Sequence, residues 1–300
     1  MFVRASSCAL VSGAGLAVAF GASLTAQHAG PSFDLAATLQ RAGQRVEHYF
    51  ARAQSLVCLE TVGLQPLGYG LSAEGRSRTV QSELRLSWDP TAETTTPLEA
   101  TTLRQVLKVN GHSPRKNDDD NCTAPEQQAT ETQPLSMLLP RQRVKYDFSV
   151  EGAGRQDGRA AILIDYRMKD KPTVEVELVN DNENCISFSI EGGMRGRIWI
   201  DAETYDVLRL DQGLAGLVDI RLPRKAARRA PELAVWTVER FDSSIRFKPV
   251  RFSDPDETLI LPVSAMSLRI TRSSGMPRLR TTTEYSQYRR FLTGGRVVPQ

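Results

Sequence analysis

The chain has 300 residues, of which 40% are hydrophobic and 24% are charged, and its net charge at pH 7 is +3. The hydrophobic fraction is sufficient for a sizeable core. A charge so close to neutral argues against nucleic acid as the main partner, because neutralising phosphates requires a strongly basic face.

Residues 1–26 have the three parts of a secretory signal peptide. Arg4 provides the positive charge, residues 9–20 are uncharged and mostly apolar, and Leu24-Thr25-Ala26 ends in a small residue before a cleavable bond. The apolar part is shorter than the roughly 20 residues of a membrane-spanning helix, which favours cleavage near Ala26 over an uncleaved anchor. We therefore expect a periplasmic or secreted protein.

An amphipathic helix is predicted at about residues 33–57, and Ser32 or Asp34 can cap its start. Its apolar positions recur at steps of three or four, and they are Leu35, Leu39, Ala42, Val46, Tyr49, Ala53 and Leu56. Phe50 and Val57 widen this stripe. The helix should therefore lie with one face across an apolar surface.

The hydrophobic period changes to two after Cys58, which predicts strands. The alternation is clearest in four sets: Leu84, Leu86 and Trp88; Val144, Tyr146, Phe148 and Val150; Val174, Val176 and Leu178; and Met266, Leu268 and Ile270. About a dozen such segments are separated by turn clusters rather than by crossover helices, so the strands should be antiparallel. A sheet of this size must curl. We predict a mainly β single domain over residues 27–300, built as a large curled antiparallel sheet in an open half-barrel.

Residues 195–211, RGRIWIDAETYDVLRLD, read as one hairpin of this sheet. A three-residue loop at 202–204 would place Ile198 opposite Leu208 and Gly196 opposite Leu210. The apolar side chains then share one face, and they are Ile198, Ile200, Leu208 and Leu210.

A short apolar run at residues 132–140, TQPLSMLLP, follows a polar stretch and is bracketed by Pro134 and Pro140. We expect this run to act as a flap. Together with the N-terminal helix it would cover the apolar concave face of the curled sheet.

Three cysteines remain after residue 26, and two of them end acidic runs, NDDDNC at 117–122 and NDNENC at 180–185. In an oxidising compartment two of three cysteines usually pair. The shared context favours a Cys122–Cys185 disulfide with Cys58 buried and free, although all three pairings remain open. The crowded carboxylates raise calcium as an alternative, but neither run has the spaced ligands of a calcium loop. We therefore expect no metal.

A helix after a signal peptide, consecutive antiparallel strands, and Gly-Arg-Ile-Trp-Ile-Asp followed by YDVLRLD together resemble the lipoprotein-carrier superfamily typified by LolA and LolB. The segments PDETLILPVS and TTTEYSQYRRFLTGGRVV resemble uncharacterised secreted bacterial proteins of similar layout. This chain is longer than typical members, with insertions at 110–140 and 221–232. The resemblance implies an open barrel whose hydrophobic cavity shelters acyl chains of a lipid or lipoprotein without catalysis.

Burying an acyl chain in such a cavity is worth about 0.8 kcal/mol per methylene. The candidate cavity-lining residues are Trp88, Leu135, Met137, Leu138, Leu139, Trp199 and Leu208. The alternative is that these side chains simply form a solid core, in which case the protein would be a non-enzymatic envelope scaffold that binds another protein.

We do not expect an enzyme or a bound cofactor. The chain has three histidines and none of the common catalytic or nucleotide-binding motifs. Asp165 is the one acidic residue within an apolar run, and a buried carboxylate is costly unless it is paired, so we expect an Arg or a backbone amide as its partner.

A basic run follows at residues 221–232, and its charges are Arg221, Arg224, Lys225, Arg228 and Arg229. This run is either a solvated loop or a contact with anionic lipid headgroups, each basic residue contributing about 1 kcal/mol near a membrane surface.

Overall fold

A computed structural model describes residues 33–53, 56–87, 101–115, 118, 133–178, 186–223, 234–253, 255–272 and 278–290. These residues belong to one compact unit within residues 31–300. The expected signal peptide, the Cys122–Cys185 pair, Trp88 and residues 224–232 of the basic run lie outside the described residues. None of the described helices combines the length and the hydrophobicity of a membrane-spanning segment.

The described elements are mostly strands. They are α1 (Leu35–Ala53), β1 (Leu56–Leu67), β2 (Arg78–Ser87), β3 (Thr101–Val109), η3 (Gln133–Leu138), α2 (Pro140–Arg143), β4 (Tyr146–Gln156), β5 (Arg159–Met168), β6 (Thr173–Leu178), β7 (Ile186–Glu191), β8 (Met194–Asp201), β9 (Val207–Leu214), β10 (Val218–Arg221), β11 (Val235–Ser253), β12 (Asp256–Arg272) and β13 (Arg278–Arg290).

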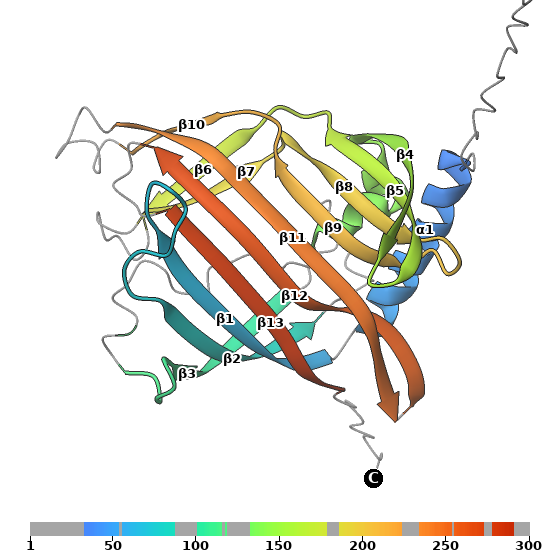
Figure 1. The fold of residues 1–300 in the computed structure, drawn as a ribbon, viewed down its shortest axis with the longest axis horizontal. Helices are drawn as coiled ribbons and strands as arrows, with labels where there is room; N and C mark the ends of the chain where they lie inside the picture. Colours follow the sequence, from blue (N-terminus) through green and yellow to red (C-terminus); the bar gives the residue numbers. More distant parts are fainter. Residues whose placement is uncertain are drawn as a thin grey trace, which may run out of the picture. The chain divides into compact units, whose positions relative to one another are not determined.

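Eleven of these strands form one antiparallel sheet in the order β3-β2-β1-β13-β12-β11-β9-β8-β5-β4, with β10 paired to β11. The end strands β3 and β4 do not pair with each other, so the sheet curls without closing (Figure 1). Strands β6 and β7 form a separate hairpin. The predicted open half-barrel of antiparallel strands is confirmed.

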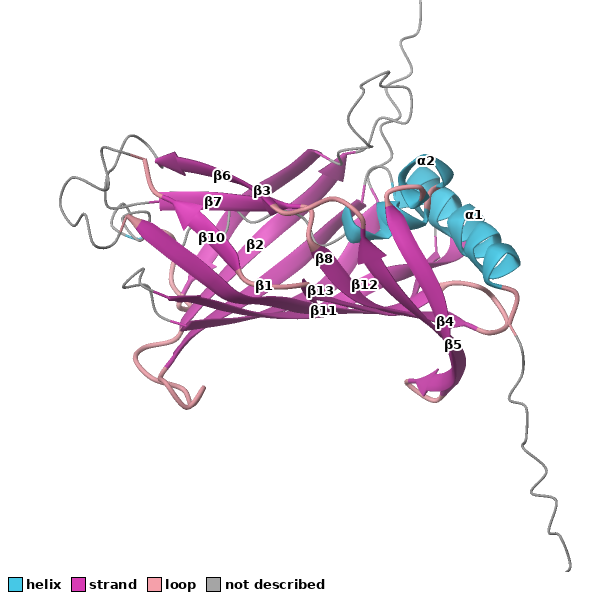
Figure 2. Ribbon diagram, turned by 90° about the horizontal axis from the view of Figure 1, so that it is seen from above, coloured by secondary structure: helices cyan, strands magenta, loops and turns pink. Residues whose placement is uncertain are grey.

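The inner face of the sheet is covered by a different element at each of its two ends. Figure 2 shows α1 and α2 above one end of the sheet and the β6–β7 hairpin above the other. Under the helices, buried side chains of α1 and η3 meet Ile164, Ile198 and Leu210 of the sheet. Under the hairpin, Leu214, Ile220 and Trp236 form a second cluster with apolar residues of β6 and β7.

Helix α1 begins as predicted, because the carboxylate of Asp34 accepts a hydrogen bond from the amide of Ala37 at 3.1 Å. The predicted end near residue 57 is wrong. The helix ends at Ala53, and Leu56 and Val57 already belong to β1. Leu56 fits both the helical stripe and the strand alternation, and cross-strand pairing with β2 and β13 decides in favour of the strand.

The predicted register of the β8–β9 hairpin is wrong by two residues. Ile198 lies opposite Leu210, Gly196 lies opposite Gln212, and a bulge follows Trp199. The turn is longer than three residues, because the amide of Asp201 donates to the carbonyl of Asp206 at 2.8 Å. Side-chain hydrogen bonds to the turn backbone, described below, fix this longer loop.

The new register changes which side chains share a face. Ile198, Ile200 and Leu210 lie in the core as predicted, and Val207 joins them. Leu208 is buried next to the bulge but is not one of the residues of that core.

Two apolar residues that were predicted to face the core point away from it. Met266 is 52% exposed whereas its neighbour Ala265 is 5% exposed, because Ala265 lies opposite Ile245 in the adjacent core row. Val144 is 69% exposed and precedes β4, which begins at Tyr146. Alternation alone does not distinguish the two faces where small and large apolar residues are adjacent.

Gly196 allows a close approach of β8 to its neighbours. A Cβ atom at this position would lie 1.9 Å from the carbonyl oxygen of Asp211 and 2.7 Å from the hydroxyl of Tyr166. That hydroxyl crosses the glycine and donates to the same carbonyl at 3.4 Å. The tyrosine therefore packs where a side chain on Gly196 would stand.

We predict that Gly196→Ala lowers the free energy of unfolding by about 1–3 kcal/mol, because overpacking forces the sheet or Tyr166 to move. Urea denaturation of the variant measures this loss. Gly216→Ala is the matched control, since no atom lies within 4 Å of its added carbon, and we expect a change of less than about 0.5 kcal/mol. Equal losses in the two variants would contradict the proposed close packing.

Candidate functional site

The predicted flap lies directly on the sheet. Leu135, Met137, Leu138 and Leu139 are 4%, 3%, 0% and 6% exposed. They belong to the same cluster as the apolar stripe of α1 and the inner face of β5, β8 and β9. The structure thus brings four of the predicted cavity-lining residues together, and it places them as a plug that fills the space between helix and sheet.

Two further predicted lining residues, Trp199 and Leu208, do not join this plug. Trp199 alternates with the buried Ile198 and Ile200, so its side chain lies on the opposite face of the sheet, where the guanidinium of Arg209 stacks 4.6 Å from the ring centroid. Leu208 lies beside the β9 bulge and is not in the core cluster.

The plug and helix α1 touch through their backbones. A Cβ atom on Gly43 of α1 would lie 2.7 Å from the carbonyl oxygen of Leu138, so only glycine allows this approach. Arg143 of α2 donates to the same carbonyl at 3.1 Å. We therefore treat α1, η3 and α2 as one cover over the inner face of the sheet.

The polar side of this cover is attached to the β8–β9 turn. The Nε atom of Arg45 lies 2.6 Å from Oδ1 of Asp206. Arg41 donates to the hydroxyl of Tyr205 at 2.8 Å and also lies over its ring, 4.9 Å from the centroid. A longer ion pair of 3.9 Å joins Arg52 to Glu257 of β12. The cover is thus apolar underneath and is held at its rim by charged groups.

Asp201 shapes the turn that presents Tyr205 and Asp206 to the helix. Its carboxylate is 4% exposed, accepts hydrogen bonds from the amides of Glu203 at 3.0 Å and Thr204 at 2.8 Å, and pairs with Arg159 at 2.8 Å. Burial alone would raise the pKa of Asp201, but these hydrogen bonds and Arg159 hold it below its ordinary value. The side chain is therefore a charged turn cap.

A second buried group of polar residues lies on β1 and its neighbours. Arg104 of β3 forms an ion pair with Glu60 at 2.8 Å, and the two side chains are 6% and 2% exposed. Cys58 is buried nearby and forms no disulfide with any described residue. Burial and the charge of Glu60 raise the pKa of this thiol to about 12, so it is not a nucleophile at neutral pH.

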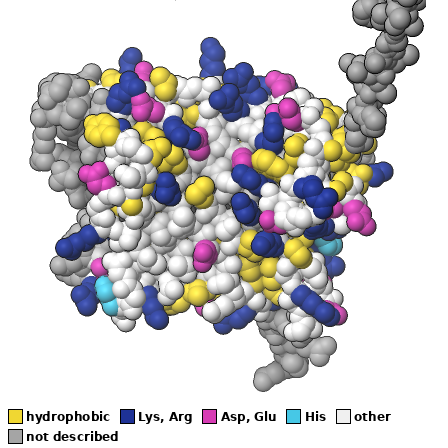
Figure 3. Space-filling view, viewed as in Figure 1, with side chains coloured by type: hydrophobic (Ala, Val, Ile, Leu, Met, Phe, Trp, Pro, Cys, Tyr) yellow, Lys and Arg dark blue, Asp and Glu magenta, His cyan; other side chains and the backbone are white. Residues whose placement is uncertain are grey.

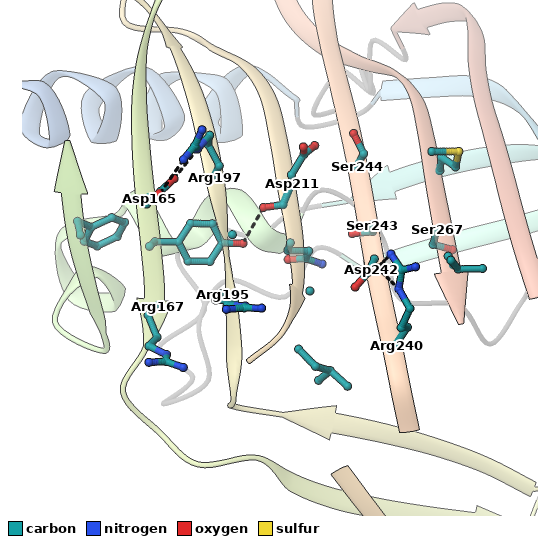
Figure 4. A pocket seen from close by; sticks show the side chains of 18 of the residues that line it. Asp165, Arg167, Arg195, Arg197, Asp211, Arg240, Asp242, Ser243, Ser244 and Ser267 are labelled. Atoms are coloured by element: carbon teal, nitrogen blue, oxygen red, sulfur yellow. Dashed lines mark hydrogen bonds and ion pairs between the residues drawn. The ribbon is translucent and has the colours of Figure 1, made fainter. Parts of the chain in front are cut away.

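The outer face of the sheet carries charged side chains (Figure 3) and an open pocket of about 970 Å³. Asp165 lies in this pocket, and its partner is an arginine, as expected. The Nε and Nη2 atoms of Arg197 donate hydrogen bonds to the two carboxylate oxygens of Asp165 at 2.5 Å and 2.8 Å (Figure 4). These hydrogen bonds lower the pKa of Asp165 although its partial burial opposes them. The carboxylate therefore stays ionised and does not act as a general acid near neutral pH.

Local sequence patterns do not predict this pocket. Its residues come from β4, β5, β8, β9, β11, β12 and β13, and only the order of the strands brings them together. The available signal was the repeated Arg and Asp on the polar side of the predicted strands. Among the described residues, no group of three or more His, Cys, Asp or Glu is arranged to hold a metal ion.

No family model and no curated protein matches this sequence. Solved structures similar to it include a domain named for outer membrane lipoprotein sorting from Vibrio parahaemolyticus, with 12% identity over 85% of this chain and 92% of that chain and a TM-score of 0.41. A DUF1329 family protein from Desulfovibrio piger has 11% identity over 87% and 95%, with a TM-score of 0.38. A LolA superfamily protein from Nitrosomonas europaea has 8% identity over 87% and 97%, with a TM-score of 0.35.

With TM-scores below 0.5, the likenesses carry no information on what this chain binds. Its function has to be inferred from its own cover, plug and outer pocket.

We predict that Asp201→Asn lowers the free energy of unfolding at pH 7 by about 1–2 kcal/mol, because a charge-assisted interaction with Arg159 is lost. The folded-state pKa of Asp201 lies below the ordinary value of 3.8, so its stabilisation is fully present above about pH 5 and is lost as the pH falls toward the lowered pKa. Urea denaturation of both proteins between pH 7 and pH 2 should show the difference shrinking below pH 4. A difference that stays constant over this range would contradict the charged turn cap.

Proposed function

We propose that this protein is a non-catalytic carrier that shelters an acyl chain of a lipid or lipoprotein between the α1 cover and the inner face of the sheet. One observation carries the proposal. The space under α1 is filled by four apolar side chains of η3 and the residue after it, a short segment that belongs neither to the sheet nor to the helix.

An acyl chain can take the place of this plug at small cost. Each methylene removed from water contributes about 0.8 kcal/mol, and the ligand would contact the same leucine and isoleucine side chains that η3 now covers. The hollow therefore need not be empty before binding. Exchange of apolar chain segments keeps the inner face covered throughout.

The rim of the cover supports opening from the α1 side. The cations Arg45 and Arg52 are 44% and 52% exposed, whereas their partners Asp206 and Glu257 are 10% and 18% exposed. Water can therefore reach the helix side of both pairs, and the Arg52 pair is long at 3.9 Å. The strands beneath are held by continuous ladders, so α1 and η3 can move while the sheet stays in place.

The alternative is an envelope scaffold with a filled core and no ligand. The complete burial of Leu138, at 0% exposure, is the observation that favours it. The two readings differ in whether η3 leaves the sheet when an acyl chain is offered.

The periplasm is the proposed location, supported by the export signal expected in residues 1–26. Contact with a membrane surface through the basic run stays part of this proposal. Of its five charges, Arg221 alone is within the described residues, and it is exposed at the end of β10.

We predict that Leu138→Ala lowers the free energy of unfolding by about 2–5 kcal/mol through loss of buried contacts, and that palmitate restores more stability to this variant than it adds to the wild type. The acyl chain would fill the space that the leucine leaves. At a ligand concentration of 100 times Kd, binding adds about 2.7 kcal/mol. Thermal unfolding with and without palmitate measures both effects.

Ile220→Ala is the matched control, since Ile220 is equally buried but belongs to the cluster under the β6–β7 hairpin. We expect a similar loss of stability without any additional gain from palmitate. The carrier proposal is wrong, and the scaffold alternative stands, if palmitate stabilises neither the wild type nor Leu138→Ala. The same conclusion follows if palmitate stabilises Leu138→Ala and Ile220→Ala equally.

A further inference from the structure

The open pocket on the outer face of the sheet is not used by the proposed carrier function. Its charged residues alternate with the buried residues of β5, β8 and β9, so it lies on the face opposite to the α1 cover. Figure 4 shows Arg167 and Arg195 on neighbouring strands and the Arg240–Asp242 pair across the opening.

Each acidic side chain of this pocket already has a basic partner. Asp165 pairs with Arg197 at 2.5 Å, and Asp211 pairs with Arg209 at 2.7 Å. Asp147 lies 3.6 Å from Lys169. Asp242, whose side chain lies over Gly213, accepts a hydrogen bond from Arg240 at 2.7 Å. Each of these carboxylates therefore has a basic partner within 4 Å.

Arg167 and Arg195 are the cations without such a partner. They lie directly opposite each other in the β5–β8 ladder, and neither forms an ion pair with any described residue. Both side chains are exposed. Arg280 of β13 also lines the pocket, and its described hydrogen bond, to the carbonyl of Leu71, is long at 3.4 Å. Like charges directly opposite each other repel, and although Asp147 lies opposite Arg167 on the other side of β5, its carboxylate forms its ion pair with Lys169.

The geometry also indicates the kind of anion. The two oxygens of one carboxylate accept hydrogen bonds from one guanidinium, as those of Asp165 do from Arg197. Two adjacent guanidinium groups offer more donors than one carboxylate can accept, whereas a phosphate has enough oxygens for both.

We propose that this pocket binds a phosphate ester, with Arg167 and Arg195 holding the phosphate. The site is separate from the acyl-chain hollow and does not depend on it. Both soluble phosphate esters and the headgroups of phospholipids carry this chemistry.

The test measures binding of glycerol 3-phosphate by isothermal titration calorimetry and by the shift in Tm, against sodium chloride at the same ionic strength. Arg195→Gln and Arg167→Gln should each weaken binding about tenfold, the effect of losing a charge-assisted hydrogen bond. Without phosphate ester, Arg195→Gln should melt at a temperature no lower than the wild type, because it removes one of two opposed like charges and Arg195 forms no ion pair with a described residue. A positioning role in the fold alone would lower Tm instead.

Arg155→Gln is the control, because Arg155 is exposed on β4, donates only to the nearby carbonyl of Gly158 and does not line the pocket. It removes the same charge and should leave binding unchanged. A second arm uses vesicles containing phosphatidylglycerol. Binding to vesicles that requires Arg195, without binding of the soluble ester, assigns the site to lipid headgroups.

Binding of the soluble ester that requires Arg195 assigns the site to small phosphate esters. The proposal is overturned if the wild type responds to neither probe beyond the salt control, or if Arg195→Gln binds either probe as the wild type does.

Discussion

The structure depends on how the apolar inner face of an unclosed sheet is kept from water. Strand alternation puts a continuous apolar surface on one side of β5, β8, β9 and β11, and none of the described strands joins β3 to β4 to close the sheet. A separate cover is therefore obligatory. In this chain the cover is made of α1, η3 and α2 at one end and of the β6–β7 hairpin at the other (Figure 2).

The two ends of the inner face are covered in different ways, and we base the proposed acyl-chain site at the α1 end on this difference. The hairpin contributes a second small sheet with its own hydrogen-bonded ladder. The α1 end is filled by a single short segment, and its rim consists of ion pairs in contact with solvent. A segment without ladder hydrogen bonds and with weak rim contacts is the part of the fold that can leave at the lowest cost. The β8–β9 turn fixes the position of that rim, because Asp201 holds the loop that carries Tyr205 and Asp206.

The same strands build the outer pocket with their other side chains. Ile164 and Ile198 contribute to the core. Their chain neighbours Asp165, which follows Ile164, and Arg197, which precedes Ile198, contribute to the outer face. The alternation therefore allows an apolar site and a polar site to share one scaffold, although Tyr166 of the core also borders the pocket. The outer site is marked by Arg167 and Arg195, which lie directly opposite each other on β5 and β8.

Much of the architecture could be predicted from the sequence, because the helix, the strands and the apolar run at 132–140 each follow from local periodicity. The β8–β9 register could not, since it depends on hydrogen bonds from the side chain of Asp201 to its own turn. The alternation at Met266 predicts the wrong inward face for β12, because the pairing of Ala265 with Ile245 on the neighbouring strand determines which face of β12 is buried. The outer pocket was missed because Arg167 and Arg195 meet only through the pairing of β5 with β8.

Native mass spectrometry of the protein purified from its own host, followed by organic extraction, tests the central claim most directly. If an acyl chain exchanges with the η3 plug, the spectrum should contain a species heavier than the bare chain by the mass of a lipid that the extract also contains. A spectrum of the bare chain alone, together with no uptake of a fluorescent fatty acid, would show that the inner face is permanently sealed by its own side chains.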